Sequence, residues 1–214
     1  MARHVFFDNS NIYGGAQRAA ESLESGAIWM SVRIHYRSIF RLIGADQAAT
    51  RVLAGSVPPG NEALWEAARE EKFNTDLLQR VARDDGSLGE QAVDEMLHLK
   101  IANALLDHKP PQTLVIASGD GAASKFGTSF VGQAERALKC EWNVEVWSWD
   151  AQLTKKYDKL CRDYSGQITV WKLDPHYKSI TFLKGGSYII NGCTIAVQDR
   201  VVHPLKIVTT VKAA

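Results

Sequence analysis

Short apolar runs alternate with longer segments of helical periodicity along most of the chain, and this alternation constrains the fold more than any other feature. The strand-like runs cover residues 4–7, 50–57, 113–117, 143–149 and 168–173. Chains that alternate strands and helices in this way form a parallel sheet with helices packed on both faces. We therefore expect an α/β fold, a three-layer sandwich built around a mainly parallel central sheet.

The predicted helices differ in the strength of their pattern. The clearest helix covers residues 91–106, where apolar residues recur at helical spacing before Pro110-Pro111 ends the segment. Weaker helical patterns cover residues 28–43, 62–71, 130–139 and 153–164. Residues 73–82 fit a helix and a strand equally well, and residues 84–87 read as a loop. The Gly-, Ala- and Ser-rich stretch after Asn11 is assigned to neither class.

The character of the chain changes near residue 178. Two β-prone runs, residues 187–190 and 193–197, flank Asn191-Gly192. Asn-Gly supplies the two positive-φ residues that a tight hairpin turn requires. We therefore predict a main α/β domain over residues 1–177 and an antiparallel appendage over residues 178–214, packed on the domain or extending it.

The charge balance limits how the protein could bind a polyanion. The 214 residues include 25 basic and 24 acidic side chains, which gives a formal net charge of +1. This balance excludes an overall basic coat for nucleic acid. A polyanionic partner would have to be held by a local patch or through a metal ion.

Cysteine content and apolar runs bear on the compartment. Cys140, Cys161 and Cys193 show no CxxC spacing, so neither a disulfide framework nor a zinc knuckle is indicated. No apolar stretch reaches the roughly 18–20 residues of a membrane helix, and Asp8 ends the N-terminal apolar run too early for a signal peptide. We expect an intracellular, cytoplasmic protein without a membrane partner.

Three motifs of common enzyme classes are missing from the sequence. There is no GxxxxGK[ST], no GxGxxG placed after a strand, and no GxSxG. Nucleoside triphosphate binding, dinucleotide binding and α/β-hydrolase chemistry therefore lack support.

Two of the predicted strands end in aspartate. Asp8 closes the first strand, and Asp120 follows the strand 113–117. In open α/β sheets, ligands bind outside the carboxyl ends of the strands. If these strands are parallel neighbours, both carboxylates emerge at the same edge, where Gly119 and Gly121 would let the backbone bend and leave room for a substrate.

A third acid, Asp94, begins the helix 91–106 and could lean over the same edge. Three converging carboxylates would form a site for Mg²⁺ or Mn²⁺, because hard cations prefer oxygen ligands. His98, one turn after Asp94, could reach such a site as a proton carrier. Each acid also has a structural alternative: Asp8 as a helix cap, Asp94 as a solvated residue of a first turn, and Asp120 as a turn residue.

Three segments, in order, resemble the motifs of NYN domains, a PIN-like group of nucleases. The first is Val5-Phe6-Phe7-Asp8-Asn9-Ser10-Asn11-Ile12, the second is Gln91-Ala92-Val93-Asp94-Glu95-Met96-Leu97, and the third is Thr113-Leu114-Val115-Ile116-Ala117-Ser118-Gly119-Asp120-Gly121. The resemblance covers roughly residues 3–175. It implies a PIN-like Rossmannoid sheet and a metal-dependent endoribonuclease, a hydrolase of RNA phosphodiester bonds.

By this resemblance, Asp8, Asp94 and Asp120 are the expected catalytic and metal-binding residues, and Asn11 is the expected orienting group. The cofactor would be Mg²⁺ or Mn²⁺, and the partner would be single-stranded or loop RNA. We expect the substrate-binding groups to be Asn11, Ser118, Ser124, Lys125 and Lys100.

Two departures from the family pattern keep other functions open. Ala122 and Lys100 stand where the family carries further acids. Fewer carboxylates weaken cation binding, and a nearby lysine would compete with the metal or contact phosphate. A catalytically weakened RNA-binding module therefore remains an alternative. A third hypothesis is an interaction scaffold whose appended hairpin pairs with another protein or with a second copy in a homodimer.

Overall fold

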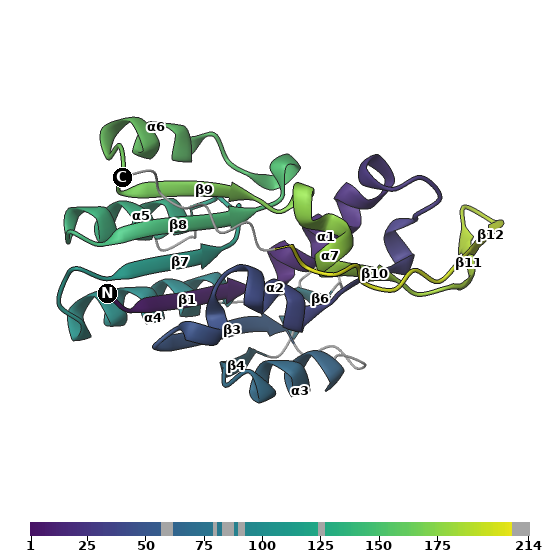
Figure 1. The fold of residues 1–214 in the computed structure, drawn as a ribbon, viewed down its shortest axis with the longest axis horizontal. Coiled ribbons are helices and arrows are strands. Elements are labelled where there is room, and N and C mark those ends of the chain that lie inside the picture. Colours follow the sequence, from purple (N-terminus) through teal and green to yellow (C-terminus); the bar gives the residue numbers. More distant parts are fainter. Residues whose placement is uncertain (57–61, 79–80, 83–87, 90–92, 124–126, 207–214) are drawn as a thin grey trace.

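The computed structural model describes residues 1–214 apart from 57–61, 79–80, 83–87, 90–92, 124–126 and 207–214. Its centre is a six-stranded parallel sheet in the order β4-β3-β1-β7-β8-β9 (Figure 1). The strands are β1 (Arg3–Asp8), β3 (Thr50–Ser56), β4 (Asn74–Leu78), β7 (Thr113–Ala117), β8 (Asn143–Ser148) and β9 (Ile168–Lys172). The predicted α/β fold around a mainly parallel sheet is confirmed.

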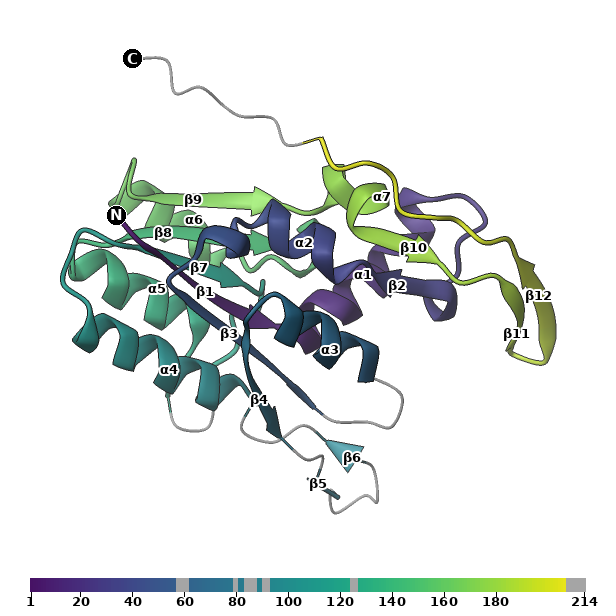
Figure 2. The same ribbon diagram turned by 60° about the horizontal axis from the view of Figure 1, so that its bottom comes forward.

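Helices cover both faces of the sheet and give three layers (Figure 2). One layer contains α1 (Asn9–Leu23), α2 (Tyr36–Leu42), α3 (Glu62–Glu70) and the short α7 (Tyr177–Ile180). The opposite layer contains α4 (Val93–Asp107), α5 (Phe130–Lys139) and α6 (Lys156–Asp163). Two residue pairs, β5 (Val81–Ala82) and β6 (Leu88–Gly89), form a small separate ladder.

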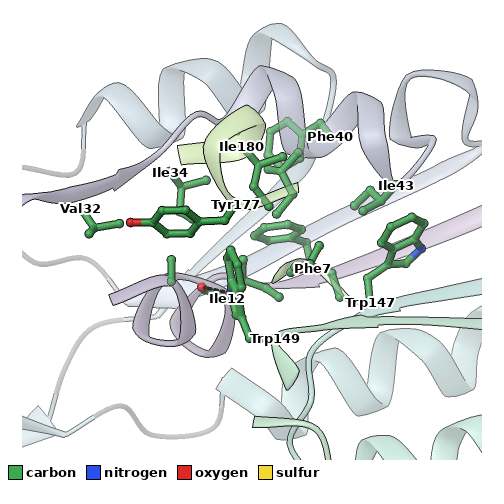
Figure 3. Packing of buried hydrophobic residues seen from close by; sticks show 14 of the residues in the cluster. Phe7, Ile12, Val32, Ile34, Phe40, Ile43, Trp147, Trp149, Tyr177 and Ile180 are labelled. Carbon is green, nitrogen blue, oxygen red and sulfur yellow. Dashed lines mark hydrogen bonds between the residues drawn. The ribbon is translucent and has the colours of Figure 1, made fainter. Parts of the chain in front are cut away.

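The two cores explain why β1 reads as an unbroken apolar run. Val5 and Phe7 point into the core beneath α1 and α2, whereas Phe6 points into the core beneath α4 and α5. All three side chains are fully buried. A strand covered on both faces has no solvent side on which polar residues could alternate. Figure 3 shows Phe7 at the centre of the first core, where its ring meets Phe40 edge-on at 5.4 Å.

Two predictions of secondary structure near the N-terminus were wrong or incomplete. The helix expected over residues 28–43 is divided into a 3₁₀ turn (Trp29–Ser31), the strand β2 (Val32–Ile34) and α2. The unassigned stretch after Asn11 is the helix α1. Both results depend on tertiary contacts, because β2 pairs with a distant strand and α1 buries small residues against the sheet.

The ambiguous segment 73–82 forms strands, β4 at the sheet edge and β5 after it. The other predicted helices are present with shifted ends, most clearly α6, which begins at Lys156. The loop expected at residues 84–87 falls outside the described residues. Further 3₁₀ turns occur at Ala45–Gln47, Asp150–Gln152 and Asp174–His176.

The C-terminal segment both packs on the domain and extends from it. The strand β10 (Thr181–Leu183) pairs antiparallel with β2. Next, β11 (Gly186–Ile190) and β12 (Cys193–Val197) form the predicted hairpin, which extends away from the sheet in Figure 2. Its turn residues Asn191 and Gly192 have φ values of 50° and 79°, as the Asn-Gly signal requires.

Within these described ranges, no helix combines the length and apolar character needed to cross a bilayer.

Candidate functional site

Asp8 and Ser118 meet at the carboxyl edge of the sheet, where β1 and β7 end side by side. The two strands are parallel neighbours, and Phe7 is in register with Ala117. The next residues along each strand, Asp8 and Ser118, therefore lie level with one another at the edge where α1 begins (Figure 1).

The Asp8 carboxylate is held by one donor from each side of this edge. Oδ1 accepts a hydrogen bond from the Asn11 amide at 3.0 Å, and Oδ2 accepts one from the Ser118 hydroxyl at 2.9 Å. Asp8 is the N-cap of α1 and is only 3 % exposed. The helix-cap role is thus real, and it fixes this carboxylate at the edge instead of leaving it mobile in solvent.

Asn11 and Asp120 extend this hydrogen-bonded arrangement across the edge. The Asn11 side-chain oxygen accepts from the Gly119 amide at 3.0 Å, and the Ser118 hydroxyl accepts from the Asp120 amide at 3.3 Å. Asp120 Oδ1 in turn accepts from the Ala122 amide at 2.7 Å, which is an Asx-turn contact. The structure thus brings Asp8, Asn11, Ser118 and Asp120 together.

Gly119 and Gly121 allow close packing of protein against this loop, not the room for substrate that we expected. A Cβ atom at Gly119 would overlap Ser148 Oγ and lie 2.8 Å from the Gln152 carbonyl oxygen. A Cβ atom at Gly121 would lie 2.5 Å from Thr154. The space beside both glycines is therefore filled by the segment that follows β8.

Asp94 lies in the first turn of α4, at the same end of the sheet. The helix ends at Asp107 and the chain then enters β7 at its amino end, so α4 runs antiparallel to the strands and begins at their carboxyl edge. One turn later, His98 is buried, and its Nδ1 lies 3.0 Å from Thr128 Oγ1. Burial lowers the pKa of His98, while the negative charges of Glu95 and Asp120 oppose that shift. The charge of Asp120 thus acts on the second turn of α4.

The side chains at this edge offer carboxylate, amide and hydroxyl oxygens, which are the ligands that a hard cation prefers. Few carboxylates are brought together here. In the part of the chain that the structure describes, no group of three or more His, Cys, Asp and Glu side chains is placed to hold a metal ion. Mg²⁺ is commonly held by one or two carboxylates together with waters and substrate phosphates. Asp8 and Asp120 are the carboxylate residues at this edge, and Asp94 lies on the neighbouring helix.

Positive charge lies beside the Asp120 loop. Lys156, at the start of α6, donates from Nζ to the Gly121 carbonyl oxygen at 2.6 Å. Lys155 and Lys159 are exposed on the same segment. An ammonium group beside a carboxylate loop could neutralise a bound phosphate without displacing a cation.

Lys100, another predicted substrate-binding residue, is not brought to this edge. Lys100 lines a separate cavity near the amino ends of β3 and β4. Ser124 and Lys125 lie outside the described residues.

No signal in the sequence singled out Tyr157, a buried residue of α6 near the same loop. Its side chain is 1 % exposed, and its hydroxyl has no hydrogen-bond partner among the described residues. Burial and the negative charge of Asp120 both raise the pKa of Tyr157. Periodicity alone marks such a tyrosine as core, because its relation to Asp120 depends on where α6 packs.

Comparisons with known proteins bear on the fold alone. No family model matches the chain, and no curated protein matches it. Among solved structures, the chain is similar to VPA0982 of Vibrio parahaemolyticus, a protein of unknown function. The TM-score is 0.56 at 16 % identity, and the match covers 81 % of this chain and 94 % of that chain. At this identity the likeness supports a shared α/β architecture.

Proposed function

We propose that the protein is a metal-dependent endoribonuclease that uses the acidic edge formed by Asp8, Asp94 and Asp120. The observation that carries the proposal is the hydrogen-bonded arrangement in which Ser118 and Asn11 fix Asp8 next to the Asp120 loop. Rigid carboxylates at the carboxyl edge of a parallel sheet are where such a fold binds ligands. The resemblance of the three motifs to NYN domains supports the same reaction class.

In this proposal, residues of the acidic edge would hold the ion and position the scissile phosphate. Asp8 and Asp120 would hold Mg²⁺ or Mn²⁺, with Asp94 acting from α4. Such an ion supplies charge neutralisation and lowers the pKa of a bound water. Asn11 would orient the phosphate or a water, and Lys156 would neutralise a neighbouring phosphate of the RNA strand.

A second candidate function is RNA binding without efficient cleavage. Two observations favour it: Ala122 occupies a position where the resembling family carries an acid, and the described residues contain no cluster of three metal-ligating side chains. A binding module would retain the lysines of α6 while holding a cation weakly. Its RNA affinity would fall steeply with salt and be indifferent to divalent ions.

The test uses a labelled single-stranded RNA and a hairpin of the same composition. Each is incubated with the wild-type protein, Asp8→Asn and Asp120→Asn in Mn²⁺, in Mg²⁺ and in EDTA. Asparagine caps helices as well as aspartate does, so Asp8→Asn should remain folded, which a thermal melt by circular dichroism checks. Asp163→Asn, an exposed acid at the end of α6, is the matched control.

Metal-dependent cleavage by the wild type and the control, lost in both variants, is the expected result. A loss of one carboxylate that holds the ion should reduce the rate at least roughly 100-fold. Cleavage that persists in both variants would remove the acidic edge from the mechanism. RNA that stays intact in every lane but shifts in a gel would favour the binding module.

A further inference from the structure

A cavity at the opposite end of the sheet has a composition suited to an anion. It has a volume of about 470 Å³ and lies between the second half of α4 and the first residues of β3 and β4. Thr50, in its wall, is in register with His4, four residues before Asp8 on β1. The cavity is thus roughly 13 Å along the strand from the acidic edge.

Cationic and amide side chains dominate the functional groups of this cavity. Lys72, Lys100 and His108 contribute basic groups, whereas Asp107 is the single carboxylate among the described residues of its wall. Asn74 and Asn103 add amides that both donate and accept hydrogen bonds. The guanidinium of Arg51, which also lines the cavity, is already bound to the Glu71 and Asp46 carbonyl oxygens. Two lysines, a histidine and one acid thus line the cavity beside Arg51.

Lys72 occupies a backbone conformation in which lysine is an uncommon choice. Its φ is 59°, in the left-handed region just after α3. Glycine is the usual residue in this conformation because it has no Cβ penalty. A lysine here is less favourable for the backbone than glycine would be, and this lysine lines the cavity.

A buried histidine, His4, lies behind two residues of the cavity wall, Thr50 and His108. His4 is 1 % exposed, and its Nδ1 lies 2.9 Å from the hydroxyl of Thr50. Its ring is 4.5 Å from the ring of His108, and its Nε2 has no hydrogen-bond partner among the described residues. Thr50 and His108 both line the cavity, so the polar wall is backed by a second polar layer and not by the apolar core alone.

We infer that this cavity binds a small phosphate monoester, such as a nucleoside monophosphate or a sugar phosphate. Lysines bind phosphate as point charges, and a volume of this size falls in the range of small-molecule sites. The phosphate would lie between Lys72 and Lys100, and the hydroxyl groups of the ligand would pair with Asn74, Asn103 and Asp107. The inference is independent of the proposed nuclease, since it uses none of the residues at the acidic edge.

The test is isothermal titration calorimetry of the full chain at low ionic strength in EDTA, which removes any contribution from a metal at the acidic edge. The probes are AMP, ribose 5-phosphate, inorganic phosphate, uncharged adenosine and a short single-stranded RNA. The variants are Lys72→Gly, Lys100→Met and Asp107→Asn, with Lys184→Met as the control on an exposed lysine far along the chain. Glycine suits the φ of residue 72, so Lys72→Gly should fold normally.

We expect the phosphorylated probes to bind and adenosine to bind at least about tenfold more weakly. Lys72→Gly and Lys100→Met should each weaken binding about fivefold or more, and Asp107→Asn should strengthen it by about twofold. Lys184→Met should bind like the wild type. The two ester probes decide between a nucleotide and a simple sugar phosphate.

Several results would overturn the inference. One is the absence of measurable binding by any phosphorylated probe. Another is binding with equal affinity in the wild type, Lys72→Gly and Lys100→Met. A third is binding of RNA alone that depends on Lys72, because the cavity would then serve as a contact for the nucleic-acid backbone and not as a small-molecule site.

Discussion

Adding one methyl group at each of the adjacent glycines Gly14 and Gly15 should have opposite effects on stability. Both glycines lie in α1. A Cβ at Gly14 would meet Arg18 at 3.6 Å, which is ordinary van der Waals contact. A Cβ at Gly15 would overlap the Gln152 side-chain oxygen and the Trp149 ring.

The expected magnitudes follow from these contacts. Alanine in place of glycine in a helix stabilises it by about 0.5–1 kcal/mol, and this gain applies at both positions. At Gly15 the new methyl must also displace Trp149, which is fully buried and donates from Nε1 to the Ile12 carbonyl oxygen at 2.8 Å. Overpacking of this kind costs about 1–3 kcal/mol. The two variants should therefore differ by about 1–3 kcal/mol, with Gly14→Ala the more stable.

Urea unfolding followed by far-ultraviolet circular dichroism measures this difference in the free energy of unfolding. Circular dichroism is preferable to tryptophan fluorescence because Trp149 itself is perturbed. The dependence on urea should have the same slope in both variants, so that the shift of the midpoint reports stability. A Gly15→Ala variant as stable as Gly14→Ala would show that α1 does not approach Trp149 as closely as described.

Two further predictions concern buried polar groups. Burial and the charge of His108 lower the pKa of His4 from 6.5 to about 4. Because the folded protein then resists protonation of His4, about 3 kcal/mol of stability should be present above pH 6.5 and lost as the pH falls to about 4. Urea unfolding across that range should show this loss in the wild type and in the exposed-site control His203→Phe, but not in His4→Phe; parallel curves for all three would contradict it. Arg200 forms an ion pair with Glu24 at 2.7 Å, and both side chains are mostly buried. Arg200→Met should cost about 3–5 kcal/mol, because it leaves the carboxylate unpaired, and a thermal melt that is unchanged would refute this.

Local signals in the sequence were sufficient for several elements. The hairpin follows from Asn191-Gly192, since the turn depends on the backbone preferences of two adjacent residues. The first strand follows from its continuous apolar run, and α4 follows from its buried stripe at helical spacing. Each of these signals acts over a few residues and needs no knowledge of distant segments.

Other elements were misread because their partners are far away in the sequence. The segment around Val32 has a helical pattern, yet Val32–Ile34 forms a strand because Thr181–Leu183 offers a matching edge. The helix α1 carries two glycines, and it is stabilised by close packing against Trp149 that the sequence does not reveal. Tertiary contacts of this kind override local propensity.

For the candidate site, too, some residues could be predicted from local pattern and others depend on distant contacts. The residues at the strand ends could be predicted from local pattern alone, which indicated Asp8, Asn11, Ser118 and Asp120. The tertiary structure decided that β1 and β7 are neighbours, which places Ser118 2.9 Å from Asp8. It also decided that Lys100 lines the cavity with Lys72 and not the acidic edge. Strand order and helix placement are set by pairing across the whole chain, and residue spacing along one segment carries no record of them.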